Sequence, residues 1–251
     1  MTHKLKRQII HFAIVASLML SCSLSMAPAA PAKYRPPKTP SAPKETTTNA
    51  TRGGSCESNS TTGLTALVPL SHVGQTSTQH PTFAWFVPDR TSRLLQFRLL
   101  TSTGRPLYKV QMQSQPGIMQ FSLPQDQPGL ALGQSYQWQV VLLCNPNVPA
   151  MNVVASAEIQ VVKPSSTLQT QLSAAQTPQQ RIDLYAESGL WHDAIAEARK
   201  NSQGQSAVLD LLDSLATSEA QPLGGWSDRL IQIQKIERQR QGQSQPPQPK
   251  L

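Results

Sequence analysis

Residues 136–144 read Tyr-Gln-Trp-Gln-Val-Val-Leu-Leu-Cys, and this stretch carries the clearest structural signal of the chain. Tyr136, Trp138 and Val140 alternate with two glutamines. Because successive side chains of a β-strand point to opposite faces, this order predicts a strand with one apolar face and one polar face.

The same alternation recurs on both sides of this stretch. It is found at residues 81–87, 95–99, 108–112, 119–123 and 153–161. Turn residues separate the segments, for example at Pro116-Gly117 and Pro128-Gly129. About six or seven short strands with no helix between them predict an antiparallel β-sandwich over residues 53–163.

Two segments of this region resemble known sandwich domains. Pro81-x-Phe83-x-Trp85 resembles the early core strand of immunoglobulin-like and fibronectin type III domains, and Tyr136-x-Trp138-x-Val140 resembles their later aromatic strand. The resemblance implies an all-β, immunoglobulin-like or fibronectin III-like sandwich.

The apolar period changes after Lys163-Pro164 and predicts a small α-helical hairpin segment over residues 164–237. Thr177-Pro178 is typical of a helix start, with Thr as the N-cap and Pro in the first turn. The stretch from Tyr185 to Ile195 resembles the inner half of a tetratricopeptide repeat, in which Gly189 would allow close helix packing. A single unit predicts a helix pair on the sandwich, because a solenoid needs about three.

A last helix is expected at residues 226–236, with arginine and lysine beside its apolar stripe. It either caps the core or lies as a basic amphipathic helix on an anionic membrane. Its Gln- and Pro-rich continuation, residues 238–251, is expected to be disordered.

The N-terminal residues predict export. A basic start is followed by the apolar run Ile9–Leu20 and by Ala27-Pro28-Ala29, which is the layout of a signal peptide over residues 1–29. Lipidation at Cys22 and an uncleaved signal anchor remain as alternatives. Residues 30–52 are rich in Pro, Thr and Lys and are expected to form a disordered linker. The expected location is periplasmic or extracellular.

The cysteine count agrees with export. Cys56 and Cys144 remain after Cys22 and predict a disulfide bond in an oxidising compartment. The alternative is two unrelated buried thiols.

The charge distribution argues against a nucleic-acid partner. The formal net charge is +8, but residues 1–52 alone carry +7. A nucleic-acid-binding domain would place its basic residues on a folded face.

No set of residues predicts catalysis, so the chain is not expected to be an enzyme. The five histidines include no pair at metal-ligand spacing, and no cofactor or metal motif is present. The carboxylate pairs Asp183/Glu187 and Asp193/Glu197 are expected on solvent-exposed helix faces, and His192 is expected at the surface. Arg90 and Arg93 lie in a loop after a strand and form a speculative binding edge.

Several motifs, taken in order, resemble a family of exported cyanobacterial proteins, domain-of-unknown-function family 928. They are Thr51-Arg52-Gly53-Gly54 before Cys56, Leu64–Pro69, Pro81–Phe83, Tyr136-x-Trp138 through Cys144, and Arg181–Ala194. The extra Ser55 before Cys56 departs from the family pattern. The resemblance implies export and fold but no activity, because the family has none assigned.

The leading functional hypothesis is a non-catalytic extracytoplasmic protein-interaction module, an accessory partner of an envelope or sensor protein. Membrane contact would come only through the signal or lipid anchor or the C-terminal basic helix. A carbohydrate- or cell-wall-binding module is the alternative and would require exposed aromatic side chains. A hydrolase ranks third and would need a cleft with two carboxylates.

Overall fold

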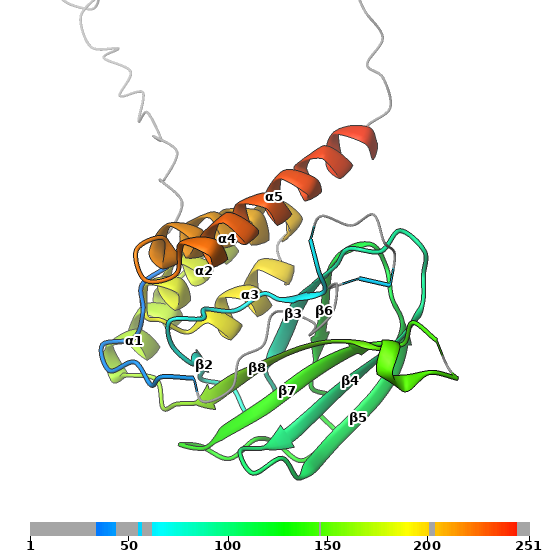
Figure 1. Ribbon diagram of the computed structural model, residues 1–251. Coiled ribbons are helices and arrows are strands. Elements are labelled where there is room, and N and C mark those ends of the chain that lie inside the picture. Colours follow the sequence, from blue (N-terminus) through cyan, green and yellow to red (C-terminus); the bar gives the residue numbers. More distant parts are fainter. Residues whose placement is uncertain (1–33, 44–54, 57–61, 146, 201–203, 245–251) are drawn as a thin grey trace, which may run out of the picture. The chain divides into compact units, whose positions relative to one another are not determined.

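The computed structural model describes residues 34–43, 55–56, 62–145, 147–200 and 204–244. The predicted signal peptide and Cys22 therefore lie outside the described residues. All described residues belong to one compact unit, Pro31–Leu251. Its described residues form two β-sheets and five α-helices (Figure 1).

The smaller sheet has three strands in the order β1-β3-β6, and both of its pairings are antiparallel. The strands are β1 (Thr65–Ala66), β3 (Thr82–Val87) and β6 (Gly117–Ser122). Phe83 and Trp85 of β3 face the other sheet, because the ring of Phe83 lies 4.9 Å from Phe97 and 5.3 Å from Trp138.

The larger sheet has five strands in the order β2-β8-β7-β4-β5. They are β2 (Gly74–Thr76), β4 (Leu94–Thr101), β5 (Pro106–Gln113), β7 (Ser135–Leu142) and β8 (Val153–Val161). β2 pairs with β8 in parallel, and the other pairs are antiparallel. A short 3₁₀ turn, Pro149–Met151, precedes β8.

The five helices follow the strands in the chain. They are α1 (Ser166–Ala174), α2 (Pro178–Glu187), α3 (Trp191–Lys200), α4 (Gly204–Glu219) and α5 (Gly224–Ser244). The expected start of α2 is confirmed, since Thr177 and Gln180 form a capping box with Pro178 in the first turn. α5 continues to Ser244, into the stretch expected to be a disordered tail.

The prediction of an all-β immunoglobulin-like sandwich followed by a small helical segment is wrong. The larger sheet is mixed, since β2 pairs with β8 in parallel, and five helices join the two sheets in one α/β fold. The physical reason lies in β3, whose six residues are all buried. Ala84 and Phe86 point away from the larger sheet and are nevertheless 2% and 0% exposed, because helices cover that face.

The contacts of Phe86 and Trp191 illustrate this covering. The guanidinium carbon of Arg240 in α5 lies 5.6 Å from the centre of the Phe86 ring. Trp191, the first residue of α3, donates its indole N–H to the Leu67 carbonyl beside β1 at 2.8 Å. The larger sheet, in contrast, keeps its second face polar, since Gln137 and Gln139 of β7 remain half-exposed.

Residues 34–43 form a strap against the helices and the β2 region. The Arg35 N–H donates to the Ala186 carbonyl at 3.1 Å, and the Val73 N–H donates to the Ser41 carbonyl at 2.9 Å. Tyr34 is 3% exposed, so this part of the expected disordered linker belongs to the core. Gly189 has φ +78°, and a Cβ there would come within 3.1 Å of the Pro37 backbone. This glycine thus serves the close approach of the strap.

Candidate functional site

The predicted disulfide is confirmed. Cys56 and Cys144 are bonded and lie 88 residues apart in the sequence. The bond ties the segment before β1 to the end of β7. On the chain-entropy model, closing a loop of this length stabilises the fold by about 4–5 kcal/mol.

Arg90 and Arg93 lie in the loop between β3 and β4. Arg90 is exposed, whereas Arg93 is half-buried and its Nε lies 4.0 Å from the buried carboxylate of Asp89. Ser55, beside the disulfide, donates its hydroxyl to the same carboxylate at 3.1 Å. Arg93 therefore helps to hold the loop, and a binding role for the two arginines stays a prediction.

A chain of polar side chains, all buried except Ser71, links the strap, the β1–β2 loop and α4. The Ser71 hydroxyl donates to Glu219 Oε1 at 2.7 Å and lies 2.9 Å from His72 Nδ1. His72 Nε2 lies 2.7 Å from the Tyr34 hydroxyl. The Ser71 hydroxyl hydrogen is used in the hydrogen bond to the carboxylate. Neutral His72 therefore donates a hydrogen bond from Nδ1 to the Ser71 oxygen and accepts one at Nε2 from Tyr34.

Apart from the exposed Ser71, the polar chain is closed to solvent. Tyr34, His72 and Glu219 are 3%, 2% and 0% exposed. Burial lowers the pKa of His72 to about 4. Burial, followed by the nearby Glu219 carboxylate, raises the pKa of Tyr34. A Ser, a His and a Glu in contact invite a catalytic interpretation. Ser71 is exposed, but His72 and Glu219 are buried and the Ser71 hydroxyl is bonded to Glu219, so the contact is assigned a structural role.

The side chains of the first three residues of α3 form hydrogen bonds that hold this helix against both sheets. Trp191 reaches Leu67, as described above. His192 Nδ1 donates to the Thr82 carbonyl at 2.9 Å, and Asp193 accepts from the backbone N–H and the hydroxyl of Ser77 at 2.9 and 2.7 Å. These side chains are at most 6% exposed, so the expected surface position of His192 and Asp193 is wrong.

Burial also shifts the acid–base behaviour of these groups. It lowers the pKa of His192 to about 4, against an opposing hydrogen bond to Thr82. It raises the pKa of Asp193, and the bonds from Ser77 oppose this shift. Both groups are held in a dry environment where the neutral form is favoured.

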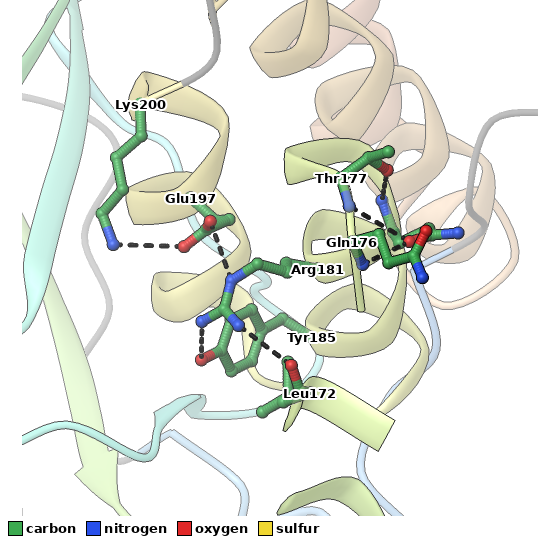
Figure 2. Close-up of polar contacts among 8 residues, drawn as sticks. Leu172, Gln176, Thr177, Arg181, Tyr185, Glu197 and Lys200 are labelled. Atoms are coloured by element: carbon green, nitrogen blue, oxygen red, sulfur yellow. Dashed lines mark hydrogen bonds and ion pairs between the residues drawn. The ribbon is translucent and has the colours of Figure 1, made fainter. Parts of the chain in front are cut away.

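A second polar cluster joins α1, α2 and α3 (Figure 2). Arg181 donates from Nε to Glu197 at 3.0 Å and from Nη1 to the Leu172 carbonyl at 3.1 Å. Lys200 pairs with the other Glu197 oxygen at 3.1 Å. Glu197 is 6% exposed, so its expected solvent position is also wrong. This carboxylate is neutralised by two cations and serves helix packing.

An open groove lies where β6 meets the helices. Its volume is about 390 Å³. The lining side chains that matter below are Ile118, Gln120, Arg199, Gln205, Val208 and Glu237. Glu237 pairs with Arg240 at 2.7 Å, and a Cβ on Gly117 would collide with both side chains. Gly117, with φ +99°, thus lets α5 rest on the start of β6.

A family model for a domain of unknown function, DUF928, matches residues 47–220, about two thirds of the chain. The chain belongs to the DUF928 family. No curated protein and no solved structure matches it.

The DUF928 match covers every strand and helices α1–α4. It leaves out the strap at residues 34–43 and helix α5. Tyr34 of the buried polar chain and Glu237 of the groove therefore lie outside the family match, while His72, Asp193 and Glu219 lie within it.

Two further properties bear on the DUF928 chain's chemistry. Within the described ranges, no three His, Cys, Asp or Glu side chains come together in a way that would hold a metal ion. In the same part of the chain, no helix has the length and apolar character that a membrane span requires.

The buried groups were missed because sequence alone hides their partners. His192-Asp193 and Ser71-His72 are short polar pairs beside apolar residues, and only this adjacency hints at the burial of His192, Asp193 and His72. Their partners lie 110 or more residues away for His192, Asp193 and Ser71.

Proposed function

We propose that this DUF928 chain is a non-catalytic protein-interaction module that works outside the cytoplasm as an accessory partner of an envelope or sensor protein. The observation that supports this most is where its reactive groups lie. His72, His192, Asp193 and Glu219 are all buried and hold helices to sheets. None of these four can reach a substrate from solvent.

The disulfide supports a location in an oxidising compartment, where such bonds persist. The expected membrane contact through the C-terminal helix finds less support. Trp226, Leu230 and Ile233 of α5 are at most 5% exposed, so the apolar stripe is already used in packing.

The carbohydrate-binding alternative required a platform of exposed aromatic rings. Among the described residues every Phe, Trp and Tyr is buried or half-buried. Glycan-binding surfaces commonly rely on such rings to stack against sugar faces, so the interaction module remains the better-supported proposal.

In-cell photo-crosslinking of the tagged, exported chain tests the proposal. A photoreactive amino acid would replace Arg90 at the loop end, Gln205 in the groove or Gln139 on the larger sheet, one position at a time. Affinity purification and mass spectrometry should then recover one dominant envelope protein from one position and not from all three. Recovery of wall material alone, or of nothing, would reject the proposal.

A further inference from the structure

β6 is an edge strand with one open side. Among the described residues of the three-stranded sheet it pairs only with β3, which lies between β1 and β6. An open edge presents backbone N–H and C=O groups that can pair with another chain.

The pattern of backbone hydrogen bonds shows which N–H and C=O groups of β6 do not bond to β3. The Leu123 N–H donates to the Pro81 carbonyl at 3.0 Å, next to the Ser122–Thr82 register pair. In an antiparallel ladder the bonded pairs alternate, so Phe121 and Met119 also bond to β3. The backbone groups of Ile118, Gln120 and Ser122 therefore point away from β3.

The other side of β3 gives the same phase. The Leu67 N–H donates to the Ala84 carbonyl at 2.9 Å, so even-numbered residues of β3 bond toward β1. The backbone groups of the odd-numbered β3 residues therefore bond to β6, in agreement with the bond from Leu123 to Pro81. Two independent hydrogen bonds thus indicate that the backbone N–H and C=O groups of Ile118, Gln120 and Ser122 point away from β3.

Within the described part of the chain, the other sheet edges carry protective features and the β6 edge does not. β5 carries Pro106 and Lys109. β1 has two residues and β2 has three, which is too short for extended pairing. β6 reads Gly-Ile-Met-Gln-Phe-Ser, with no charge and no proline. Proteins usually blunt edges with charge, proline or short length, so an unprotected edge calls for an explanation.

The groove along this edge is equipped for a peptide. Ile118 and Val208 supply apolar surface. Gln120 Oε1 is buried and has no hydrogen-bond partner among the described residues. Arg199 is exposed and forms no ion pair within the described ranges, while Glu237 is neutralised by Arg240. The net charge available to a ligand is therefore positive.

We propose that an extended peptide segment of a partner protein adds to the free edge of β6 as a further strand, with an acidic side chain facing Arg199. Main-chain bonds would give affinity, and alternate side chains in the groove would give specificity. This inference rests on the proposed interaction function and assigns its site and the kind of segment that binds.

The chain's own C-terminal residues fit this edge poorly. Pro246, Pro247 and Pro249 lack N–H donors, and Lys250 would add a positive charge near Arg199. A second copy of the chain is the other competing occupant, and the experiment below separates it.

The test is selection of phage-displayed random peptides of about ten residues against the purified full chain, a length typical of a long strand. Enriched peptides should alternate apolar and polar residues, lack central proline and carry Asp or Glu. A fluorescein-labelled copy of the most enriched peptide is then the probe in fluorescence polarisation. Two further peptides would be N-methylated at every second backbone nitrogen, one at the odd positions and one at the even positions. Only one of these two sets of N–H groups faces β6, so one peptide should lose binding and the other should bind nearly as before.

Three protein variants complete the test. Gln120→Pro removes an outward N–H, and its ring blocks the approach of the added strand, so it should weaken binding about tenfold or more. Arg199→Glu should weaken the acidic peptide and favour its Lys-substituted form. Lys109→Glu, on the protected β5 edge, is the matched control and should change nothing. Circular dichroism melting confirms that each variant is folded.

Three results would overturn the inference. They are no enriched peptide, equal effects of the two N-methylation phases, or a dimer in sedimentation velocity that Gln120→Pro abolishes, which would assign the edge to a second copy. If Gln120→Pro fails to fold, the N-methylation phases and Arg199→Glu still decide. If selection fails while photo-crosslinking from Arg90 or Gln139 recovers an envelope protein, the interaction function stands and only this site is lost.

Discussion

The two sheets are held to each other by one kind of contact, and the helices are attached to the sheets by another. Between the two sheets, aromatic and aliphatic side chains meet, and Phe97 lies 4.9 Å from Phe83 and 4.8 Å from Phe121. Between sheets and helices, buried titratable groups are embedded among the apolar side chains, as with His192 on Thr82 and Glu219 on Ser71.

The difference teaches how each contact responds to change. An apolar contact depends on area and shape, so it depends little on pH. A buried polar contact depends on direction and protonation, because an unpaired or newly charged group in a dry site is costly. The sheet–sheet contact should therefore resist acid, and the sheet–helix contact should not.

The largest expected effect comes from breaking the sheet–sheet contact. Phe97→Ala removes a ring that touches several others and should lower the free energy of unfolding by about 4 kcal/mol. Urea denaturation at neutral pH and at about pH 5.5 should give the same loss. Phe97→Leu, the control, should cost about 1 kcal/mol. A strongly pH-dependent loss for Phe97→Ala would contradict the comparison.

Acidification should act on the sheet–helix contact. The folded pKa of His72 and of His192, each about 4, lies below the usual 6.5, so the unfolded chain binds protons first as pH falls. Stability is then present above pH 6.5 and is lost on descent toward pH 4. The loss between pH 6 and pH 5 should be about 2 kcal/mol. The raised pKa of Asp193 acts in the opposite direction and reduces the loss.

His192→Gln separates the contributions to this loss. The variant lacks one titrating group, so its stability should fall less steeply over the same pH interval, as followed by denaturant titrations. An unchanged slope would mean that His192 titrates alike in the folded and unfolded chain.

Tyr34→Phe should have a smaller effect. It removes the hydroxyl that donates to His72 Nε2 and leaves that buried acceptor unpaired, at a cost of about 1–2 kcal/mol. Thermal unfolding measures the loss. Limited proteolysis should cut the strap at residues 34–43 faster than in the wild type. Equal cleavage rates would show that the bond does not hold the strap.

The smallest effect is expected on the polar face of the larger sheet. Gln139→Ala should change the free energy of unfolding by less than about 0.5 kcal/mol, because the side chain is half-exposed. Denaturation at neutral pH measures it. A loss above about 1 kcal/mol would mean that this face is not simply solvated.

Much of the local structure could be predicted from the sequence. The strands around Trp85, Phe97 and Trp138 and the start of α2 at Thr177 lie where the patterns place them. The bond between Cys56 and Cys144 follows from an even count, and the family match agrees with the quoted motifs. The fold class could not be predicted, because nothing in the sequence shows that helices cover the face of β3 that carries Ala84 and Phe86.

The sequence by itself determined most of the strands and helices and which two cysteines join, because hydrophobic period and turn chemistry are local properties. Only the tertiary structure decided that helices cover β3, that β2 runs parallel to β8, and that His192, Asp193, Tyr34 and Glu219 are buried. A period shows which face of an element avoids water but not what covers it, and a polar side chain becomes a core residue only when a distant segment supplies its hydrogen-bond partner.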